Sequence, residues 1–107
     1  MNTHDCIFCK VIEKQVPAEV IEENDDVIVI RDIAPKAPIH YLIIPKKHIK
    51  DLNELDDAKL AGKLLFTAKK LAKGEPFRLV ISNGYDAGQR VFHLHIHFLS
   101  GKKMLDV

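Results

Sequence analysis

The sequence has no excess of charge of either sign and no long hydrophobic run. Its 107 residues contain 16 Lys and Arg against 15 Asp and Glu, a net charge of +1, so the composition does not suggest a nucleic-acid-binding or membrane-binding surface. No apolar segment approaches the roughly 18 residues of a membrane span, and residues 1–5 lack the layout of a signal peptide. We therefore expect a cytoplasmic protein with a small ligand, and a single domain over residues 1–107 that would gain from oligomerisation.

Cysteine is also scarce. The only two cysteines, Cys6 and Cys9, form one C-x-x-C motif, which in a reducing compartment indicates metal or redox chemistry rather than a structural disulfide. One helical turn or a knuckle would bring both thiols to the same side. A pair of buried, unreactive thiols also fits the motif, so the motif needs partners elsewhere in the chain.

Histidine, in contrast, is concentrated in one place. Three of the six histidines are His93, His95 and His97. In a β-strand these imidazoles would share one face, about 6.6 Å apart, because successive side chains point to opposite faces. The opposite face would then carry the apolar residues Phe92, Leu94, Ile96 and Phe98. Such a row can bind an anion or contribute metal ligands, and a half-exposed strand without function is the third interpretation.

The rest of the chain alternates short apolar runs with turn residues. The pattern predicts a short helix within residues 6–13 and a long helix ending near Ala72, which Asp51 or Asn53 would cap. The predicted strands are residues 18–22, 27–31, 40–44, 77–82 and 90–99. The second of these strands begins with four apolar residues, which indicates burial on both faces.

Loop residues offer candidates for ligand contacts. Asp32 directly follows a buried strand and could accept hydrogen bonds from two hydroxyls, as a ribose would offer, although Asp at such a place also caps loops. The loop 83–89 contains Gly84 and Gly88, which allow backbone amides to approach an anion closely; a hairpin loop without function fits the same composition. His48 follows the strand-ending Pro45 and would otherwise be typical of a surface residue.

Together these residues resemble the histidine triad (HIT) superfamily, whose signature is His-φ-His-φ-His-φ-φ, where φ is apolar. Residues 93–99 match this signature. The other matching segments, in chain order, are Cys6 to Lys10 with Pro17, Asp32-Ile33, Ala37 to His40, Ile44 to Ile49, and Gly88-Gln89. The sequence looks most like the Hint branch, the purine nucleoside phosphoramidases, which hydrolyse the P–N bond of nucleoside 5′-phosphoramidates.

The resemblance implies both a fold and a mechanism. The fold is of the α+β class, a five-stranded antiparallel sheet with one long and one short helix, paired as a homodimer through the long helix and a sheet edge. His95 would be the nucleophile that forms a nucleotidyl-histidine intermediate, and His97 would bind the phosphate and help protonate the leaving amine. Imidazole suits both roles, because its pKa near 6.5 leaves it largely neutral at pH 7.

The resemblance also implies a binding site for a purine nucleotide. Asp32 would hold the ribose hydroxyls with Ile33 beside it, and the residues flanking the base would be Phe8, Val11, Val16 and Ile30. Gln89 and the amides from Gly88 to Val91 would surround the phosphate. Arg90 stands where many Hint proteins have a Ser that touches phosphate, and Arg can make such a contact bidentately. Ser82 stands where the family often has Asn, and the adjacent Asn83 could take that role.

The cysteines acquire a role from the same resemblance. Bacterial members with this N-terminal C-x-x-C hold a structural zinc, and here its ligands would be Cys6, Cys9, His48 and His93. Two thiolates and two imidazoles suit a closed tetrahedral zinc site. The chemical step itself would need no cofactor.

Three other functions remain as alternatives. A dinucleoside polyphosphate hydrolase of the same superfamily would keep the mechanism and change the leaving group. A metal-dependent enzyme would use the three histidines of the row as ligands. A nucleotide-binding regulatory module would hydrolyse its ligand only incidentally.

Overall fold

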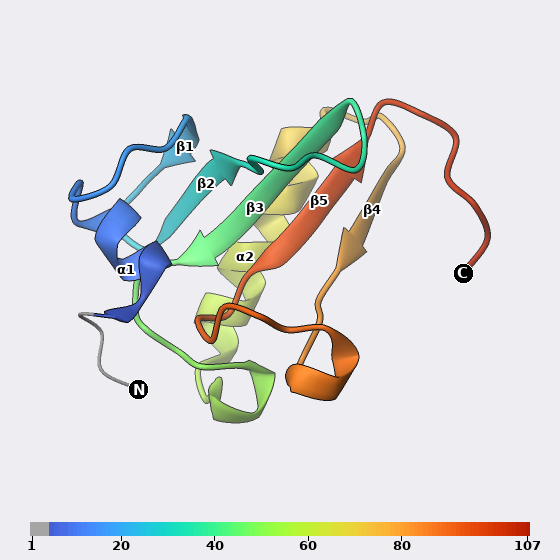
Figure 1. The fold of residues 1–107 in the computed structure, drawn as a ribbon. Coiled ribbons are helices and arrows are strands. Elements are labelled where there is room, and N and C mark those ends of the chain that lie inside the picture. Colours follow the sequence, from blue (N-terminus) through green and yellow to red (C-terminus); the bar gives the residue numbers. More distant parts are fainter. Residues whose placement is uncertain (1–4) are drawn as a thin grey trace.

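The computed structural model describes residues 5–107 and shows a five-stranded antiparallel sheet with a helix on each face (Figure 1). The strand order is β1-β2-β3-β5-β4. The helices and strands, in chain order, are α1 (Ile7–Ile12), β1 (Val20–Glu23), β2 (Val27–Arg31), β3 (Ile39–Pro45), α2 (Ala58–Ala72), β4 (Phe77–Val80) and β5 (Ile96–Ser100). This architecture confirms the expected α+β class, with one long and one short helix.

The two faces of the sheet build two separate apolar clusters. Val27 and Val29 of β2 pack with α2, whereas Ile28 and Ile30 of the same strand pack with α1. All four side chains are buried, as expected for a central strand covered on both faces. The prediction that β2 is buried on both faces is therefore confirmed, and Figure 1 shows α1 and α2 on opposite sides of the sheet.

The predicted cap of the long helix was wrong. The helix begins at Ala58, and the side chain of Asp57 caps it by accepting hydrogen bonds from the amides of Lys59 and Leu60. Asp51 instead caps a separate 3-10 turn over Leu52–Glu54. Between the two, Leu55 is extended (φ −77°, ψ 112°), so the backbone cannot continue from the turn into the helix.

The histidine-bearing strand is shorter than predicted. Strand β5 begins only at Ile96, because its pairing with β3 ends at Ile96 and its pairing with β4 ends at His97. Before that point the amide of Leu94 donates to the carbonyl of Ile49 in a connecting loop. The alternation of side chains nevertheless persists, since Leu94, Ile96 and Phe98 all lie in the α2 cluster.

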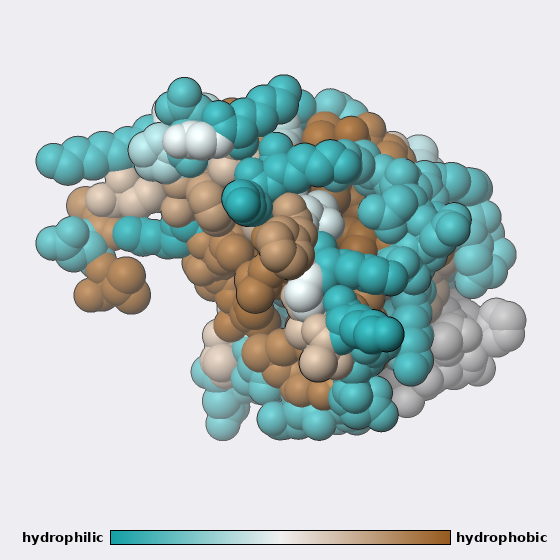
Figure 2. Space-filling view, turned by 180° about the vertical axis from the view of Figure 1, so that it is seen from behind, coloured by the Kyte–Doolittle hydropathy of each residue, from teal (hydrophilic) through white to brown (hydrophobic). Residues whose placement is uncertain are grey.

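The α2 side of the molecule carries exposed hydrophobic side chains (Figure 2). Leu65 and Phe66 of α2 are 57% and 70% exposed. Phe77 of the edge strand β4, whose ring stacks on that of Phe98, is partly exposed as well. Over residues 5–107, no helix is both long enough and apolar enough to cross a bilayer.

Candidate functional site

Two groups of titratable side chains meet on the α1 side of the sheet, around the start of β5. The first, the thiol–imidazole cluster, consists of Cys6, Cys9, His48 and His93. The second, the histidine–aspartate cluster, consists of Asp32, His40 and His97. In sequence, His95 lies between His93 of the first cluster and His97 of the second. The centroids of the His95 and His97 rings are 5.2 Å apart.

The thiol–imidazole cluster is assembled from three parts of the chain. Cys6 and Cys9 lie at the start of α1, where the Cys6 Sγ also accepts a hydrogen bond from the Cys9 amide. The Cys6 Sγ is 3.3 Å from Nδ1 of His93, and the Cys9 Sγ is 3.2 Å from Nδ1 of His48. All four candidate ligand atoms lie within 4.8 Å of one another. Tetrahedral zinc with its usual bond lengths places sulfur and nitrogen ligands roughly 3.5 Å apart, so the side chains fit such an ion.

The protonation of this cluster depends on whether a cation is bound. Burial and the neighbouring Cys6 raise the pKa of the Cys9 thiol to about 12, so in the absence of a compensating positive charge the thiol keeps its proton. Burial lowers the pKa of His93 to about 4, which leaves that imidazole neutral, as a metal ligand must be. Nε2 of His93 donates to the carbonyl of Pro45 at 2.7 Å, so the lone pair is on Nδ1 and faces the thiols. The cluster can hold a metal ion.

His95 has its lone pair on the other ring nitrogen. Its Nδ1 lies 2.8 Å from the carbonyl oxygen of His93, and a carbonyl can only accept, so Nδ1 carries the proton and Nε2 the lone pair. Burial lowers the pKa of His95, partly offset by this hydrogen bond and by the charge of Asp32. The ring also packs edge-on against Phe8, with centroids 5.0 Å apart. His95 is therefore a neutral, oriented imidazole at pH 7.

His97 is oriented by His40, a residue that sequence reasoning did not assign to the site. The amide of Lys36 donates to Nδ1 of His40 at 3.0 Å, so His40 carries its proton on Nε2 and donates it to Nδ1 of His97 at 2.9 Å. The remaining proton of neutral His97 must then be on Nε2, where it can be donated to a ligand. Asp32 lies 3.4 Å from Nε2 of His40.

Burial lowers the pKa of both members of this histidine pair. For His40 the charge of Asp32 opposes that effect and Lys36 adds to it. For His97 the neighbouring His95 and His40 lower the pKa further, and Asp32 again raises it. With no ligand bound, both rings are therefore neutral at pH 7.

His40 could have been found only with the strand register in hand. It lies opposite Leu99 on the antiparallel partner strand, while His97 lies opposite Leu42. His40 and His97 are thus diagonal neighbours on one face of the sheet, close enough for their rings to meet. Their separation of 57 positions in the sequence hides that contact.

A cavity of about 590 Å³ opens beside His97. It brings together Asp32 and Arg90 from the sequence-predicted set with residues that were not in it. The full lining is Asp32, Ala34, Lys36, His40, Val80, Ser82, Arg90, His97 and Leu99. The cavity therefore offers the His97 proton donor, a carboxylate, a hydroxyl and two cationic side chains to one ligand.

The loop before the histidines is held by its own polar side chains. Gln89 is 2% exposed, and its amide accepts from the Gly84 amide and donates to the carbonyls of Lys50 and Val91. Asn83 accepts from the amide of Leu52. Both side chains therefore use their hydrogen bonds to shape the loop. Gly88 has a φ of 104° beside Ser82, a conformation that favours glycine.

The residues expected to flank the base lie together under α1. Phe8, Val11 and Ile30 belong to one buried cluster, against which Val16 and Val91 pack. Ile33, in contrast, is fully exposed in the loop after Asp32. Asp32 also accepts from the amide of Ala34, so it serves as a loop cap and keeps its second oxygen toward His40.

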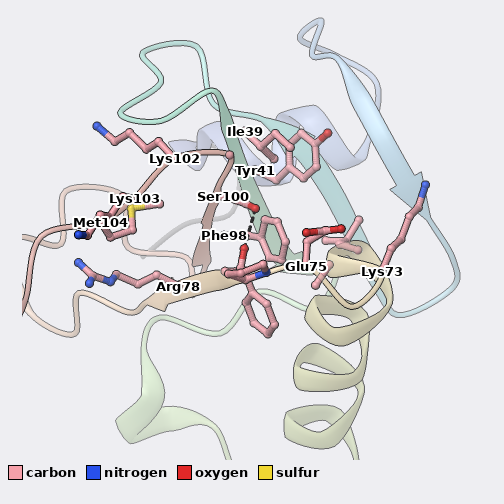
Figure 3. A pocket seen from close by; sticks show the side chains of 15 residues that line it. Ile39, Tyr41, Lys73, Glu75, Arg78, Phe98, Ser100, Lys102, Lys103 and Met104 are labelled. Carbon is pink, nitrogen blue, oxygen red and sulfur yellow. Dashed lines mark hydrogen bonds between the residues drawn. The ribbon is translucent and has the colours of Figure 1, made fainter.

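A larger cavity of about 870 Å³ lies on the α2 side (Figure 3). Stacked rings of Tyr41, Phe98 and Phe77 form part of its wall, and Lys102 and Lys103 lie at its margin. Among residues 5–107, no histidine, cysteine or aspartate lines it. The titratable clusters described above lie on the opposite face.

The antiparallel sheet, with the His-φ-His-φ-His-φ-φ segment of residues 93–99 leading into its strand β5, is the arrangement expected of a histidine triad protein. The HIT domain family model matches residues 13–104, and the chain belongs to that family. The uncharacterized HIT-like protein slr1234 of Synechocystis is 44% identical over 104 residues, which cover 92% of this chain and 91% of the relative.

Solved structures agree with this family assignment. A HIT family hydrolase from Legionella pneumophila is 42% identical with a TM-score of 0.90, covering 94% of this chain and 96% of that one. A HIT family hydrolase from Clostridium thermocellum is 39% identical with a TM-score of 0.92, covering 96% of each chain. A histidine triad protein from Clostridium difficile reaches a TM-score of 0.93 at 36% identity, covering 100% of this chain and 99% of its own.

Proposed function

We propose that this protein is a hydrolase that cleaves purine nucleoside 5′-phosphoramidates at the P–N bond, through a nucleotidyl-histidine intermediate on His95. The observation that carries the proposal is the hydrogen bond from Nδ1 of His95 to the carbonyl of His93 at 2.8 Å, because it leaves Nε2 as the nucleophilic atom. Similarity to two HIT family hydrolases supports the reaction class.

In the first step, the Nε2 lone pair of His95 attacks the α-phosphorus, and the bond from phosphorus to the amine nitrogen breaks. The departing nitrogen needs one proton to leave as a neutral amine. His97 supplies that proton from Nε2 in its protonated form, which the nearby negative phosphoryl group favours. When His97 carries two protons, its Nδ1 becomes a donor, so His40 must then present a bare Nε2 and give up the hydrogen bond from the Lys36 amide.

In the second step, water attacks the phosphorus of the intermediate. A P–O bond forms, the bond to His95 breaks, and the proton of the water passes to His97. Both histidines return to their starting protonation states, and the products are a nucleoside monophosphate and an amine. Two displacements on one imidazole replace a single, more difficult displacement by water.

The remaining groups bind and orient the nucleotide in this proposal. Asp32 accepts hydrogen bonds from the ribose hydroxyls, and the amides of the loop from Gly88 to Val91 face the phosphate. Fixed backbone donors of this kind stabilise charge that develops in the transition state. The apolar cluster that contains Phe8, Val11 and Ile30 borders the base.

A structural zinc completes the proposal. Cys6, Cys9, His48 and His93 would hold it, and when bound it would neutralise two thiolates and link α1 to the segment before β5. The same segment carries the His93 carbonyl that orients His95, so the cluster supports the nucleophile indirectly. Free thiols of this kind persist in a reducing compartment, which fits a cytoplasmic protein.

The nucleophile is tested by turnover of adenosine 5′-phosphoramidate. We expect wild type to release ammonia and to give an adenylylated enzyme by mass spectrometry after a rapid quench, and His95→Ala to show neither. Imidazole added to His95→Gly should restore part of the turnover. Retained activity in His95→Ala, or adenylylation of another residue, would overturn the mechanism.

A further inference from the structure

Arg90 is an exposed residue that lines the cavity beside His97. Its Nη1 donates to the carbonyls of Tyr85 and Gln89 at 2.8 and 3.1 Å. Its guanidinium carbon lies 4.2 Å from the centroid of the Tyr85 ring, a distance typical of cation–π stacking. These contacts fix the plane of the guanidinium and use one nitrogen, so Nε and Nη2 have no partner among residues 5–107.

The charge around this cavity is unbalanced. Arg90 and Lys36 both line it, and neither forms an ion pair within the described part of the chain. Asp32 is the single acidic residue that the described part of the chain contributes to the lining, and its oxygens already face the Ala34 amide and His40. Two cations therefore lack an anionic partner at a place where His97 presents its proton.

The position of Arg90 relative to His97 indicates which part of a substrate it meets. In the proposed mechanism His97 protonates the leaving atom, so the leaving group lies beside His97 in the cavity that Arg90 and Lys36 also line, and the ribose meets Asp32 of the same lining. In the same mechanism the α-phosphate lies against Nε2 of His95, which attacks it. A cation fixed in the leaving-group cavity interacts most strongly with a negative charge carried by that group.

We infer that Arg90, assisted by Lys36, selects substrates whose leaving group is an anion, such as the carboxylate of an amino acid joined through its nitrogen or the terminal phosphate of a polyphosphate. This inference rests on the proposed function. The bond changes are those described above: the bond from phosphorus to the leaving nitrogen or oxygen breaks, and that atom takes the proton of His97. The distal carboxylate or phosphate keeps its charge and its contacts with Arg90 throughout.

A pair of nearly isosteric substrates tests the carboxylate arm. AMP joined to the nitrogen of glycine differs from AMP joined to glycinamide only in the charged end group. We expect wild type to favour the glycine compound by about tenfold in kcat/KM, equivalent to about 1.4 kcal/mol. In Arg90→Ser the ratio should fall to within about twofold of one, and Arg90→Lys should give an intermediate value because it keeps the charge and loses the planar fork.

Arg78→Ser is the matched control, since it removes an arginine that lines the other cavity, and it should keep the wild-type ratio. Because each ratio is measured within one preparation, partial unfolding of a variant lowers both rates equally and leaves the ratio unchanged. Raising the salt concentration should reduce the wild-type ratio, as expected for a partly exposed charge pair.

The phosphate arm uses diadenosine tetraphosphate, and its kcat/KM is compared with that for unsubstituted adenosine 5′-phosphoramidate. A loss in Arg90→Ser that is confined to the glycine compound identifies carboxylates as the ligand, and a loss confined to the tetraphosphate identifies phosphates. A wild-type ratio near one, or ratios unchanged by Arg90→Ser in both arms, would overturn the inference alone. Absence of turnover on every substrate would overturn the proposed function as well.

Discussion

At the scale of single residues, the site works because each imidazole has one nitrogen assigned by the backbone. The carbonyl of Pro45 takes the proton of His93 and turns its lone pair toward the thiols. The carbonyl of His93 takes the proton of His95 and leaves Nε2 free. The Lys36 amide acts on His97 through His40. In the proposed mechanism these three chemically identical rings would serve as a metal ligand, a nucleophile and a proton donor.

With these roles, the pH dependence of kcat/KM should differ between a leaving group that needs a proton and one that does not. Attack requires neutral His95, and burial lowers its pKa, so kcat/KM should rise as the pH increases through that value. Departure of an amine requires protonated His97, whose pKa burial also lowers, so kcat/KM for adenosine 5′-phosphoramidate should fall again at higher pH. A nitrophenyl ester of AMP, whose leaving group departs as an anion, should show the rise without the fall.

The two profiles are measured as kcat/KM from about pH 4 to pH 9, because this parameter reports the first chemical step on the free enzyme and free substrate. The groups that surround His97 are His95, His40 and Asp32, with Arg90 and Lys36 in the same cavity. An equal fall for both substrates at high pH would contradict the role of His97 as the acid.

The same two substrates test whether His40 orients His97. His40→Ala removes the donor to Nδ1 of His97, so the ring loses its fixed orientation and its assigned proton. We expect kcat/KM for adenosine 5′-phosphoramidate to fall by about tenfold to a hundredfold, the usual cost of a misplaced catalytic group. The loss should be smaller for the nitrophenyl ester, which needs no proton from His97. Equal losses on both substrates would indicate a structural role only.

At the scale of elements, the pattern of apolar residues predicted the strands better than the polar residues predicted where a helix begins. The run from Val27 to Ile30 identified a strand buried on both faces, because such a run is unfavourable anywhere else. The N-cap of α2 was predicted wrongly, since Asp51, Asn53 and Asp57 are all acceptable capping residues and only the extended backbone at Leu55 separates them. A local pattern cannot resolve that choice.

Site residues that form a short sequence motif were predicted from the sequence, whereas those that meet only in the folded chain were not. The alternation of His93, His95 and His97 is visible in five residues. The C-x-x-C acquired its partners only through the family resemblance, and the structure then placed all four side chains within 4.8 Å. His40 was not predicted as a site residue, because its contact with His97 depends on the register of β3 against β5.

The thiol–imidazole cluster should couple the position of α1 to activity. We expect purified wild type to carry one zinc per chain by elemental analysis. Removal of that zinc by a chelator should lower the free energy of unfolding by about 3 kcal/mol, or roughly 10 to 20 °C in Tm for a domain of this size. Turnover should decline with it, since the backbone carbonyl that orients His95 belongs to a ligand residue.

The control for that experiment is the double variant Cys6→Ser, Cys9→Ser. It should contain less than about a tenth of an equivalent of zinc and should have a low Tm that the chelator does not change further. If the chelator destabilises the double variant as much as it destabilises wild type, the effect does not arise from this cluster.

At the scale of the whole molecule, the chemistry and the exposed apolar surface lie on opposite sides. The histidines and thiols meet on the α1 side, whereas Leu65 and Phe66 are exposed on α2. Strand β4 ends the sheet order and leaves one edge of backbone groups unpaired by the strands described here. We propose that a second copy of the chain covers this surface, so that a homodimer forms without obstructing either active site.

Phe66→Asp tests that arrangement. A charge in place of a 70% exposed ring cannot be buried against an apolar partner without a large cost, so we expect the dimer to weaken by at least about thirtyfold, in the range of a central interface residue. Analytical ultracentrifugation over a concentration series would measure the shift from dimer toward monomer. Leu52→Asp, a similar change outside α2 and β4, should leave the wild-type dimer intact. A monomeric wild type, or equal effects of both variants, would place the partner elsewhere.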